Sequence, residues 1–488
     1  MTATAPASSP TARPDEPWSL HEDRALPADP ATRPVARMIH RATRDLPLVA
    51  MHGHVPVEWF ADDSSFGDPA QLLVVPDHYL VRLLASQGAR IEQLGVPPLP
   101  GVPGITAEAD PREVWRRFCA GWPLFRGTPT RFWLETELVE VFGVTKRPSA
   151  ATADAIYDQV QAAIDDPAFR PRALLDRFRI EVISTTDPAE STLADHARLT
   201  ADGLGHRVLP TFRPDALLAV DRPDWRDLLA RLGVAVGTDV EHYPGYLEAL
   251  RMQRARFKAA GARASDHGLI GTSTTPLPDA EAARIFTAAV RGQVTAAEAE
   301  AFAGHMLFQM AAMAAEDGLV MQIHPGVLRD HDPATAAAFG PDRGYDIPVA
   351  TEFTRSLRPL LAAFGRHPGF RTILFTTDES VYSRELAPLA GVYPGVRLGA
   401  PWWFLDAPDA MRRFRETVTE TAGFVNTSGF VDDTRAFVSI PARHDLARRI
   451  DAGYLARLVV EHRLDLGEAM ETAADLAYHL PLLAYEAR

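Results

Sequence analysis

Two histidines separated by a single residue, His52 and His54, end a short apolar segment that begins at Leu46. Successive side chains of a β-strand point to opposite faces, so residues i and i+2 project from the same face. We therefore expect both imidazoles to project together from the end of a buried strand, with Gly53 leaving room between them. Two imidazoles held in this way can bind a divalent metal ion. The alternative is an ordinary pair of histidines near a strand end.

A late acidic residue is our candidate for the third metal ligand. Catalytic metal sites commonly have three protein ligands and keep a further position open for water or substrate. We assign Asp433 to this ligand set, together with His52 and His54. Asp432 is the residue most easily confused with it, because adjacent residues of an extended segment face opposite ways.

Four further side chains could hold an organic substrate. Arg213 and Arg435 each follow a predicted strand, and a guanidinium group can bind a carboxylate through two parallel hydrogen bonds. A surface salt bridge is the alternative for each arginine. Trp402 and Trp403 also lie at a predicted strand end. They form either an aromatic platform for a sugar ring or part of the packing of the fold.

The segment Asp77-His78-Tyr79-Leu80-Val81-Arg82 brings together groups that can transfer protons and position a substrate. His78 and Tyr79 are the candidates for proton transfer, and Arg82 is the candidate for substrate binding. The alternative is a helix N-terminus with an exposed histidine.

Eight short apolar segments, separated by longer helical stretches, must position these residues. They span residues 46–54, 178–184, 206–212, 262–267, 318–324, 371–377, 396–404 and 423–431. Strands that alternate with helices indicate a parallel α/β fold, and eight such units predict a (β/α)8 TIM barrel. The polar residues described above follow the C-terminal ends of these segments, where barrels of this kind carry their active sites. Asp266 and His324 end the fourth and fifth segments.

Three regions of different composition indicate the domain organisation. Residues 1–35 are rich in Ala, Pro, Thr, Ser and Asp, so we expect a disordered or loosely attached leader. Residues 36–488 would form the barrel. Amphipathic helical patterns without a strong strand pattern predict a helical insertion at about residues 70–150, after the first strand.

The composition excludes some classes of function. The chain of 488 residues has 64 acidic and 50 basic residues, and its net charge of -14 argues against binding to nucleic acid or anionic membranes. We find no apolar segment of the ~20 residues that a membrane helix needs and no signal peptide. Cys119 is the single cysteine, which is typical of a cytoplasmic protein. We expect a cytoplasmic homo-oligomer that acts on a small molecule.

Several ordered segments resemble the uronate isomerases, a branch of the amidohydrolase superfamily. The resemblance extends from about residue 38 to about residue 450. It rests on His52-Gly53-His54, Asp77-His78-Tyr79 with Arg82, Thr185-Thr186-Asp187-Pro188, Leu209-Pro210-Thr211-Phe212-Arg213-Pro214-Asp215, Ala264-Ser265-Asp266-His267, Gln322-Ile323-His324, Phe339-Gly340-Pro341-Asp342 with Gly344 and Asp346, Trp402-Trp403-Phe404 with Asp406, and Asp433-Thr434-Arg435 with Phe437. Three positions depart from the family pattern. The family usually has Asp where this chain has Ala50 and Cys where it has Gly53, and it often has a second acid where Pro188 follows Asp187.

The resemblance implies a (β/α)8 barrel with a helical insertion and an activity that interconverts aldose and ketose uronates. The substrates would be pairs such as D-glucuronate and D-fructuronate, or D-galacturonate and D-tagaturonate. It implies that His52, His54 and Asp433 hold a divalent metal, which is zinc in many members. It also implies that the substrate site is lined by His78, Tyr79, Arg213, Asp266, His324, Trp402 and Arg435.

Such an isomerisation moves a proton from C2 to C1 of the open-chain sugar through an enediol. It needs a base near C2, electrophilic groups at the oxygens and a grip on the distant carboxylate. Asp433 or Tyr79 would be the base, and tyrosine could serve only if nearby cations lowered its pKa. Two other functions remain open: a metal-dependent hydrolase or decarboxylase on the same barrel, and a binding protein without catalytic activity.

Overall fold

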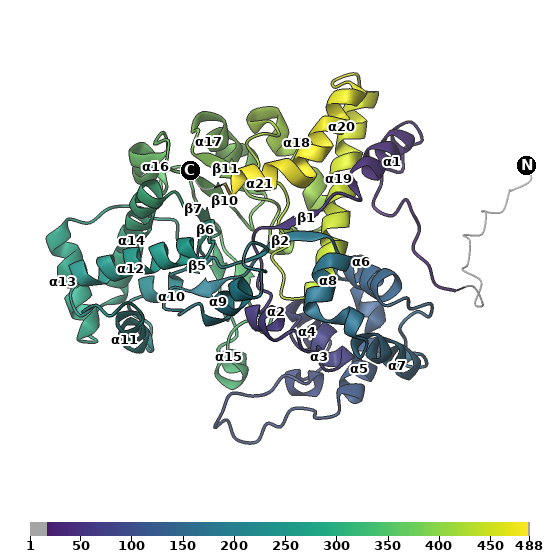
Figure 1. Ribbon diagram of the computed structural model, residues 1–488, viewed down its shortest axis with the longest axis horizontal. Helices are drawn as coiled ribbons and strands as arrows, with labels where there is room; N and C mark the ends of the chain where they lie inside the picture. The colour runs from purple at the N-terminus through teal and green to yellow at the C-terminus, as the bar shows by residue number, and fades with distance from the viewer. Residues whose placement is uncertain (1–16, 487–488) are drawn as a thin grey trace, which may run out of the picture.

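The computed structural model describes residues 17–486. Residues 1–16 of the predicted leader lie outside the described residues. Within residues 17–31, Trp18 and Leu26 are buried, and the Trp18 ring packs edge-on against Trp122 with centroids 6.2 Å apart. The first helix, α1 (Thr32–Thr43), packs against α19 (Ile440–Val460), so a helix from the N-terminal part of the chain lies beside one from the C-terminal part (Figure 1).

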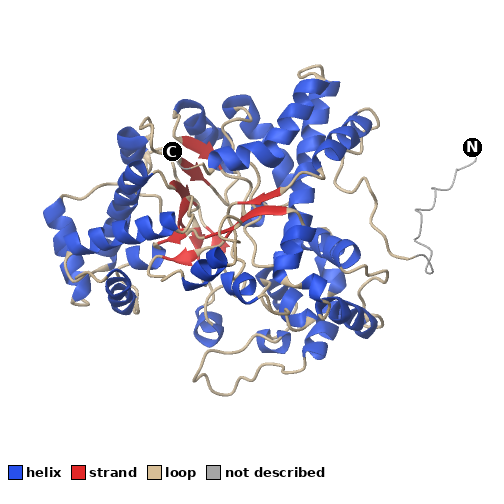
Figure 2. Ribbon diagram, in the orientation of Figure 1, coloured by secondary structure: helices blue, strands red, loops and turns tan. Residues whose placement is uncertain are grey.

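Short parallel strands occupy the middle of the molecule, and helices surround them (Figure 2). They are β1 (Leu48–Ala50), β2 (Ile180–Ser184), β3 (Asp187–Pro188), β4 (Val208–Leu209), β5 (Phe212–Arg213), β6 (Ala264–His267), β7 (Val320–Ile323), β10 (Thr372–Leu374) and β11 (Val396–Leu398). Hydrogen bonding follows the orders β1-β2-β4 and β11-β10-β7-β6-β5-β3. Residues 180–188 and 208–213 contribute to both sheets, which joins them into one parallel series. The α/β fold class that the sequence predicts is confirmed.

The eighth predicted strand, 423–431, is the exception. In the structure it contains only a parallel bridge between Thr427 and Leu398. The chain bends at Gly429, where φ is +72° and Pro481 packs so closely that a Cβ atom would lie 2.3 Å from its ring. Beyond the bend, the amide of Asp433 donates to the carbonyl of His52 at 3.2 Å, and the amide of His54 donates to the carbonyl of Thr434 at 2.9 Å. These bonds connect the last segment to the first and close the ring.

Helices cover the outside of the ring. They are α9 (Ala194–Ala201), α10 (Asp215–Leu218), α11 (Trp225–Val236), α12 (Tyr243–Ala259), α13 (Asp279–Val290), α14 (Ala296–Asp317), α16 (Arg358–Phe364), α17 (Ala387–Val392), α18 (Pro408–Ala422), α19, α20 (Leu466–Ala474) and α21 (Leu480–Ala484). The short helix α15 (Pro333–Phe339) belongs instead to the loop after β7. The longest, α14, begins at a capping box formed by Thr295 and Glu298 and ends at Gly318 in the left-handed conformation. Among residues 17–486, no helix is both long and apolar enough to span a bilayer.

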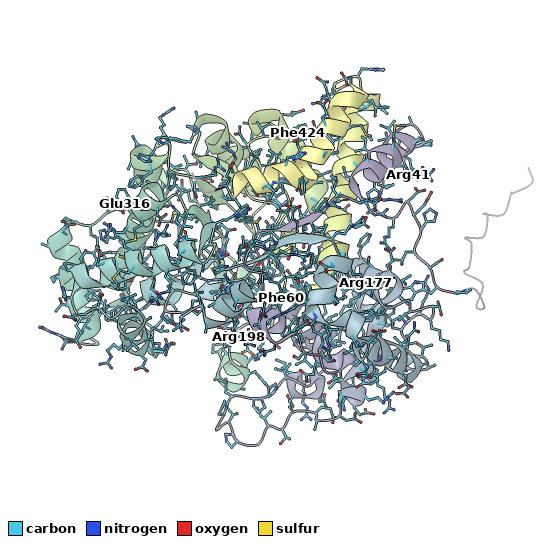
Figure 3. All side chains as sticks on the ribbon, viewed as in Figure 1. Arg41, Phe60, Arg177, Arg198, Glu316 and Phe424 are labelled. Carbon is cyan, nitrogen blue, oxygen red and sulfur yellow. The ribbon has the colours of Figure 1, made fainter. Side chains whose placement is uncertain are left out.

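The chain between β1 and β2 is helical and packs as a separate layer beside the barrel. It contains α2 (Val57–Asp62), α3 (Pro69–Leu73), α4 (His78–Ser86), α5 (Pro111–Ala120), α6 (Pro129–Thr136), α7 (Ala153–Ile164) and α8 (Pro171–Arg177). Phe60 and Arg198 lie near the junction of this layer with the barrel (Figure 3), where Arg198 of α9 pairs with Asp62 of α2 at 2.8 Å. Asp77 caps α4 by accepting hydrogen bonds from the amides of the second and third helical residues, which fixes where His78 and Tyr79 point.

A buried glutamate in this layer makes stability depend on pH. Glu137 lies in η3 (Glu137–Val141) with 3% of its surface exposed, and burial, with the nearby charge of Asp77, raises its pKa to about 8. Because the folded pKa is above the unfolded value, the folded state binds the proton more tightly. Stability from this group is fully present below about pH 4.5 and is lost as the pH rises through about 8.

We therefore expect Glu137→Gln to raise the melting temperature at pH 8.5 and to change it little at pH 5. Differential scanning fluorimetry at both pH values measures this. The matched control is Glu140→Gln in the same helical segment, where the side chain is 56% exposed and pairs with Arg24. Its effect should be the same at both pH values. A Glu137→Gln effect that does not change with pH contradicts the account.

Candidate active site

A cavity of about 640 Å³, open to solvent, lies at the C-terminal ends of the strands. Its wall is formed by His54, Pro76, Asp77, His78, Tyr79, Arg213, His324, Arg329, Asp342, Trp402, Trp403, Asp433, Thr434, Arg435, Ala436 and Arg443. These residues come from the strand ends, from α4 and α19, and from the long loop after β7. The cavity thus forms where a barrel places its active site.

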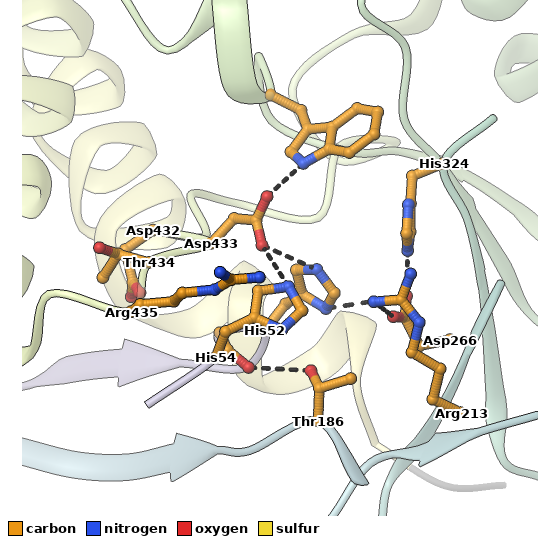
Figure 4. Close-up of polar contacts among 12 residues, drawn as sticks. His52, His54, Thr186, Arg213, Asp266, His324, Asp432, Asp433, Thr434 and Arg435 are labelled. Atoms are coloured by element: carbon orange, nitrogen blue, oxygen red, sulfur yellow. Dashed lines mark hydrogen bonds and ion pairs between the residues drawn. The ribbon is translucent and has the colours of Figure 1, made fainter. Parts of the chain in front are cut away.

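Three side chains converge at one end of this cavity (Figure 4). Asp433 Oδ1 lies 3.0 Å from His54 Nε2 and 3.3 Å from His52 Nε2. The two imidazoles project from just beyond β1, and the carboxylate reaches them from the opposite end of the chain. Asp432, in contrast, turns away and contacts His444 Nε2 at 3.2 Å. Of the two adjacent aspartates, Asp433 is therefore the one that faces the histidines.

This cluster has the donor set and spacing of a divalent metal site. The three ligand atoms lie within 4.8 Å of one another, and Asp433 Oδ1 is buried against the two imidazole nitrogens. Burial lowers the pKa of His54, whereas at His52 the charges of Asp266 and Asp433 outweigh burial and raise the pKa. Two imidazole nitrogens and one carboxylate oxygen suit a borderline-soft divalent cation. The cluster is therefore fitted to hold a divalent metal.

A second set of charges lies beside the histidines. Asp266, at the end of β6, is fully buried and contacts His324 Nε2 through Oδ1 and Arg213 Nη1 through Oδ2, the latter at 3.3 Å. His52 Nδ1 is 3.9 Å from Asp266 Oδ1. Burial raises the pKa of Asp266, but the charges of His324, His52 and Arg213 hold it well below its usual range. This carboxylate therefore stays ionised and fixes Arg213, which also contacts Asp215 at 3.0 Å.

Two residues of the α4 segment line the cavity, whereas the third does not. The rings of His78 and Tyr79 stack with centroids 4.4 Å apart. Burial, together with Arg435, lowers the pKa of His78 to about 3, so its imidazole is neutral at physiological pH. Arg82 lies outside the cavity wall and places its guanidinium 4.9 Å from the centroid of the Phe404 ring.

Trp402 contacts Asp433 on the side opposite His52 and His54. Its indole Nε1 donates a hydrogen bond to Asp433 Oδ2, and the centroid of its ring lies 4.9 Å from that of His324. The indole therefore orients Asp433 so that Oδ1 points to His52 and His54. In this structure Trp402 is a packed side chain that orients Asp433. Its ring does not form an open platform for a sugar.

Arg435 is already paired with a carboxylate. Its Nη2 donates to Asp342 Oδ2 at 2.7 Å, and Asp342 Oδ1 lies 3.5 Å from Nη1 of Arg329. Arg329 Nη1 also contacts the buried Asp346 at 3.2 Å, and the guanidinium lies over the Trp403 ring at 4.7 Å. The loop after β7, which includes the hairpin β8 (Val327–Leu328) and β9 (Ile347–Pro348), carries these groups to the cavity.

Arg329 and Arg443 line the cavity, although the sequence analysis did not single them out. For Arg329 a signal existed, because it lies five residues beyond His324 in a loop that follows a predicted strand. For Arg443 there was none, since it lies within a long helix whose orientation only the packed structure defines.

Comparison with known proteins identifies the family. A family model for glucuronate isomerase matches residues 31–481 of this chain. The chain belongs to the glucuronate isomerase family. The resemblance to uronate isomerases noted in the sequence is thereby confirmed.

Individual relatives agree with this assignment over nearly the full length. The uronate isomerase of Xanthomonas campestris pv. campestris (strain B100) is 52% identical over 470 residues, which cover 96% of this chain and 99% of the relative. The crystal structure of glucuronate isomerase from Caulobacter crescentus matches with a TM-score of 0.93 and 49% identity, covering 96% of this chain and 97% of that one. A uronate isomerase from Thermotoga maritima matches with a TM-score of 0.89 and 27% identity, covering 96% and 100% of the two chains.

In this member of the glucuronate isomerase family, the segments that carry the resemblance meet in one place. His54, His78, Tyr79, Arg213, His324, Trp402, Asp433 and Arg435 all line the cavity. His52 and Asp266 lie directly behind its wall, in contact with Asp433 and Arg213 respectively. Arg82 is the one predicted site residue that neither lines the cavity nor contacts His52, Asp266, Arg213 or Asp433; its guanidinium lies over the Tyr79 and Phe404 rings.

Proposed function

We propose that this protein interconverts aldose and ketose hexuronates, such as D-glucuronate and D-fructuronate or D-galacturonate and D-tagaturonate, by proton transfer through an enediol. The observation that carries this proposal is the convergence of the His52, His54 and Asp433 cluster with arginines in a single cavity. The cluster supplies groups for the C1–C2 end of an open-chain sugar, and the arginines supply cations for its carboxylate. Membership of the glucuronate isomerase family supports the same activity.

Asp433 is the base that we propose for the proton at C2. Its Oδ1 faces the histidines and its Oδ2 faces Trp402, so the carboxylate lies at the cavity wall with a fixed orientation. Tyr79 is less suited, because burial raises the pKa of its phenol, an effect that Arg443 offsets only in part. We assign Tyr79 and the neutral His78 to hydrogen bonds with the sugar oxygens, where they can donate as the enediol develops charge.

We propose Zn²⁺ as the metal held by His52, His54 and Asp433. When bound, it would act as a Lewis acid that stabilises charge on the oxygens at C1 and C2. The residues of the chain would still have to hold the sugar extended, keep its reacting end against Asp433 and exclude water from the enediol.

The arginines would bind the carboxylate and hydroxyl groups, helped by His324. Arg213 is held by Asp266 and Asp215, so its guanidinium is fixed before a substrate arrives. Arg329 lines the cavity, and its contacts with Asp342 and Asp346 both use Nη1. We therefore add Arg329 to Arg213 and Arg435 as a candidate ligand of the carboxylate. This grip would select uronates over neutral sugars.

Gly344 holds the loop that carries Asp342 in place. Its φ is +88°, and an added Cβ would lie 2.8 Å from the carbonyl oxygen of His78 and 2.6 Å from Cβ of Arg82. We expect Gly344→Ala to displace the loop and raise KM for the hexuronate about tenfold, since the strain amounts to about 1–2 kcal/mol. Steady-state kinetics measures this effect.

The matched control is Gly237→Ala, at a φ of +69° with no atom within 4 Å of the added Cβ. This variant carries similar backbone strain far from the cavity wall, so it should lower the melting temperature and leave KM unchanged. Equal KM values for the two variants would argue against a role for the loop in substrate binding.

The proposed function is tested by incubating the purified protein with D-glucuronate and D-galacturonate and measuring ketose formation. We expect a ketose of unchanged carbon number, and we expect elemental analysis to find about one divalent metal ion per chain. Release of a fragment from an amide, ester or carboxyl substrate would instead indicate the hydrolase or decarboxylase. Tight uronate binding without turnover would indicate a binding protein.

A further inference from the structure

Arg443 is a buried cation behind the cavity, and the proposed function assigns it no role in substrate or metal binding. It lies near the start of α19 with 2% of its surface exposed, and part of it reaches the cavity wall. Its guanidinium stacks 3.6 Å from the centroid of the Trp133 ring and 5.6 Å from that of Tyr79. A buried charge persists only when it is paired, and Asp406 Oδ2 accepts a hydrogen bond from Arg443 Nη1 at 2.8 Å.

The other contacts of Arg443 reach both sides of Asp433. Its Nη1 donates to the backbone carbonyl of Asp432 at 3.3 Å, and its Nε donates to Ser439 Oγ at 3.2 Å. Ser439 Oγ in turn lies 3.2 Å from Thr434 Oγ1. One guanidinium group is therefore connected to the residue before Asp433 and to the residue after it.

Asp433 needs this support because of its backbone. Its φ is +42°, in the left-handed region, which costs a non-glycine residue about 1–2 kcal/mol and persists only when the surroundings enforce it. The amide of Asp433 donates to the His52 carbonyl at 3.2 Å, so the Asp432–Asp433 peptide is held by its N–H on one side and by its C=O, through Arg443, on the other. The next residue, Thr434, accepts from the amide of His54 at 2.9 Å.

We propose that Arg443 is a positioning residue, which holds the strained turn at Asp433 and thereby aims its Oδ1 at His52 and His54. Arg443 acts through the backbone of Asp432 and through Ser439, not on the substrate. The inference depends on the proposed function only for the roles of Asp433, which are to bind the metal and to accept the proton at C2. The same position of the carboxylate serves metal binding and proton transfer, so loss of Arg443 impairs both.

The test compares Arg443→Lys and Arg443→Met with a matched buried arginine elsewhere in the barrel. Lysine keeps a positive charge beside Asp406, but its single ammonium group cannot reach both Asp432 and Ser439. Arg254→Met is the control, because Arg254 is 1% exposed, pairs with Asp317 at 2.6 Å and lies over the Phe212 ring. Three quantities are measured on the full chain: amide hydrogen exchange of residues 430–436, Zn²⁺ affinity by chelator competition, and kcat with KM for D-glucuronate.

We expect faster exchange of residues 430–436, Zn²⁺ affinity lowered about 10–100-fold and a fall in kcat that exceeds the change in KM for both Arg443 variants. Arg254→Met should lower the melting temperature and leave all three quantities as in the wild type. If Arg443→Met does not fold, Arg443→Lys decides. Exchange of residues 430–436 in the folded Arg443 variants equal to that of Arg254→Met would overturn the proposal. Absence of ketose from the wild-type protein would refute the proposed function alone, since exchange still decides the role of Arg443.

Discussion

Asp433→Asn should lower kcat for D-glucuronate by about 10²–10⁴-fold, the contribution that a positioned base makes. An amide has the shape of the carboxylate but cannot accept the C2 proton, and it is a weaker metal ligand. The substitution would also remove the negative charge from the group that lies 3.3 Å from His52 Nε2 and 3.0 Å from His54 Nε2. Steady-state kinetics, combined with elemental analysis of bound metal, measures both consequences.

Asp432→Asn is the matched control for this substitution. Asp432 is buried beside its neighbour but pairs with His444 Nε2 at 3.2 Å, on the side away from the cavity. The Asp432→Asn variant should have a lower melting temperature and should retain the bound metal. Its kcat should change less than about tenfold, because no cavity group changes. Equal losses of kcat in the two variants would mean that the two carboxylates are not distinguished as proposed.

Arg213→Met should raise KM for the hexuronate about 10–150-fold. Hydrogen bonds to charged groups contribute about 1.5–3 kcal/mol, and each 1.4 kcal/mol is a factor of ten in affinity. Because Arg213 is held by Asp266 at 3.3 Å and by Asp215 at 3.0 Å, its guanidinium is already oriented for a substrate carboxylate. Initial-rate measurements over a range of D-glucuronate concentrations give KM and kcat separately.

Two comparisons separate substrate binding from damage to the fold. Arg213→Lys keeps the charge beside Asp266 but loses the planar fork, so its KM should lie between those of the wild type and Arg213→Met. A carboxylate-free competitor, the neutral aldose, should lose much less affinity than the uronate. An unchanged KM for the uronate in Arg213→Met would remove this residue from carboxylate binding.

Backbone periodicity explains why the proximity of His52, His54 and Asp433 could be predicted from the sequence. A strand end places His52 and His54 on one face whatever the rest of the fold does, and a closed ring brings the last segment beside the first. Seven of the predicted strands are present for the same reason, since buried parallel strands are continuous apolar segments. The segment 423–431 was predicted as a strand but does not form one, because the chain bends at Gly429, where it packs against Pro481. This is a tertiary contact, which the local sequence pattern does not indicate.

Partners of the charged side chains could not be predicted in this way. Nothing in the sequence near Arg435 indicates that its guanidinium group donates a hydrogen bond to Asp342, in a loop 93 residues away. Arg82 follows His78 by one helical turn, yet its guanidinium lies over the Phe404 and Tyr79 rings and does not line the cavity. Arg443 contacts the peptide before Asp433 only because of how α19 packs. Such contacts depend on the packing of helices and long loops, which local patterns do not specify.

The most direct measurement of the central claim is a proton NMR time course of D-glucuronate with wild-type protein and with Asp433→Asn under identical conditions. We expect the wild type to convert the aldose into a ketose without loss of carbon, and we expect the variant to leave the aldose unchanged over the same period. Cleavage products, no ketose from the wild type, or equal conversion by both proteins would contradict it.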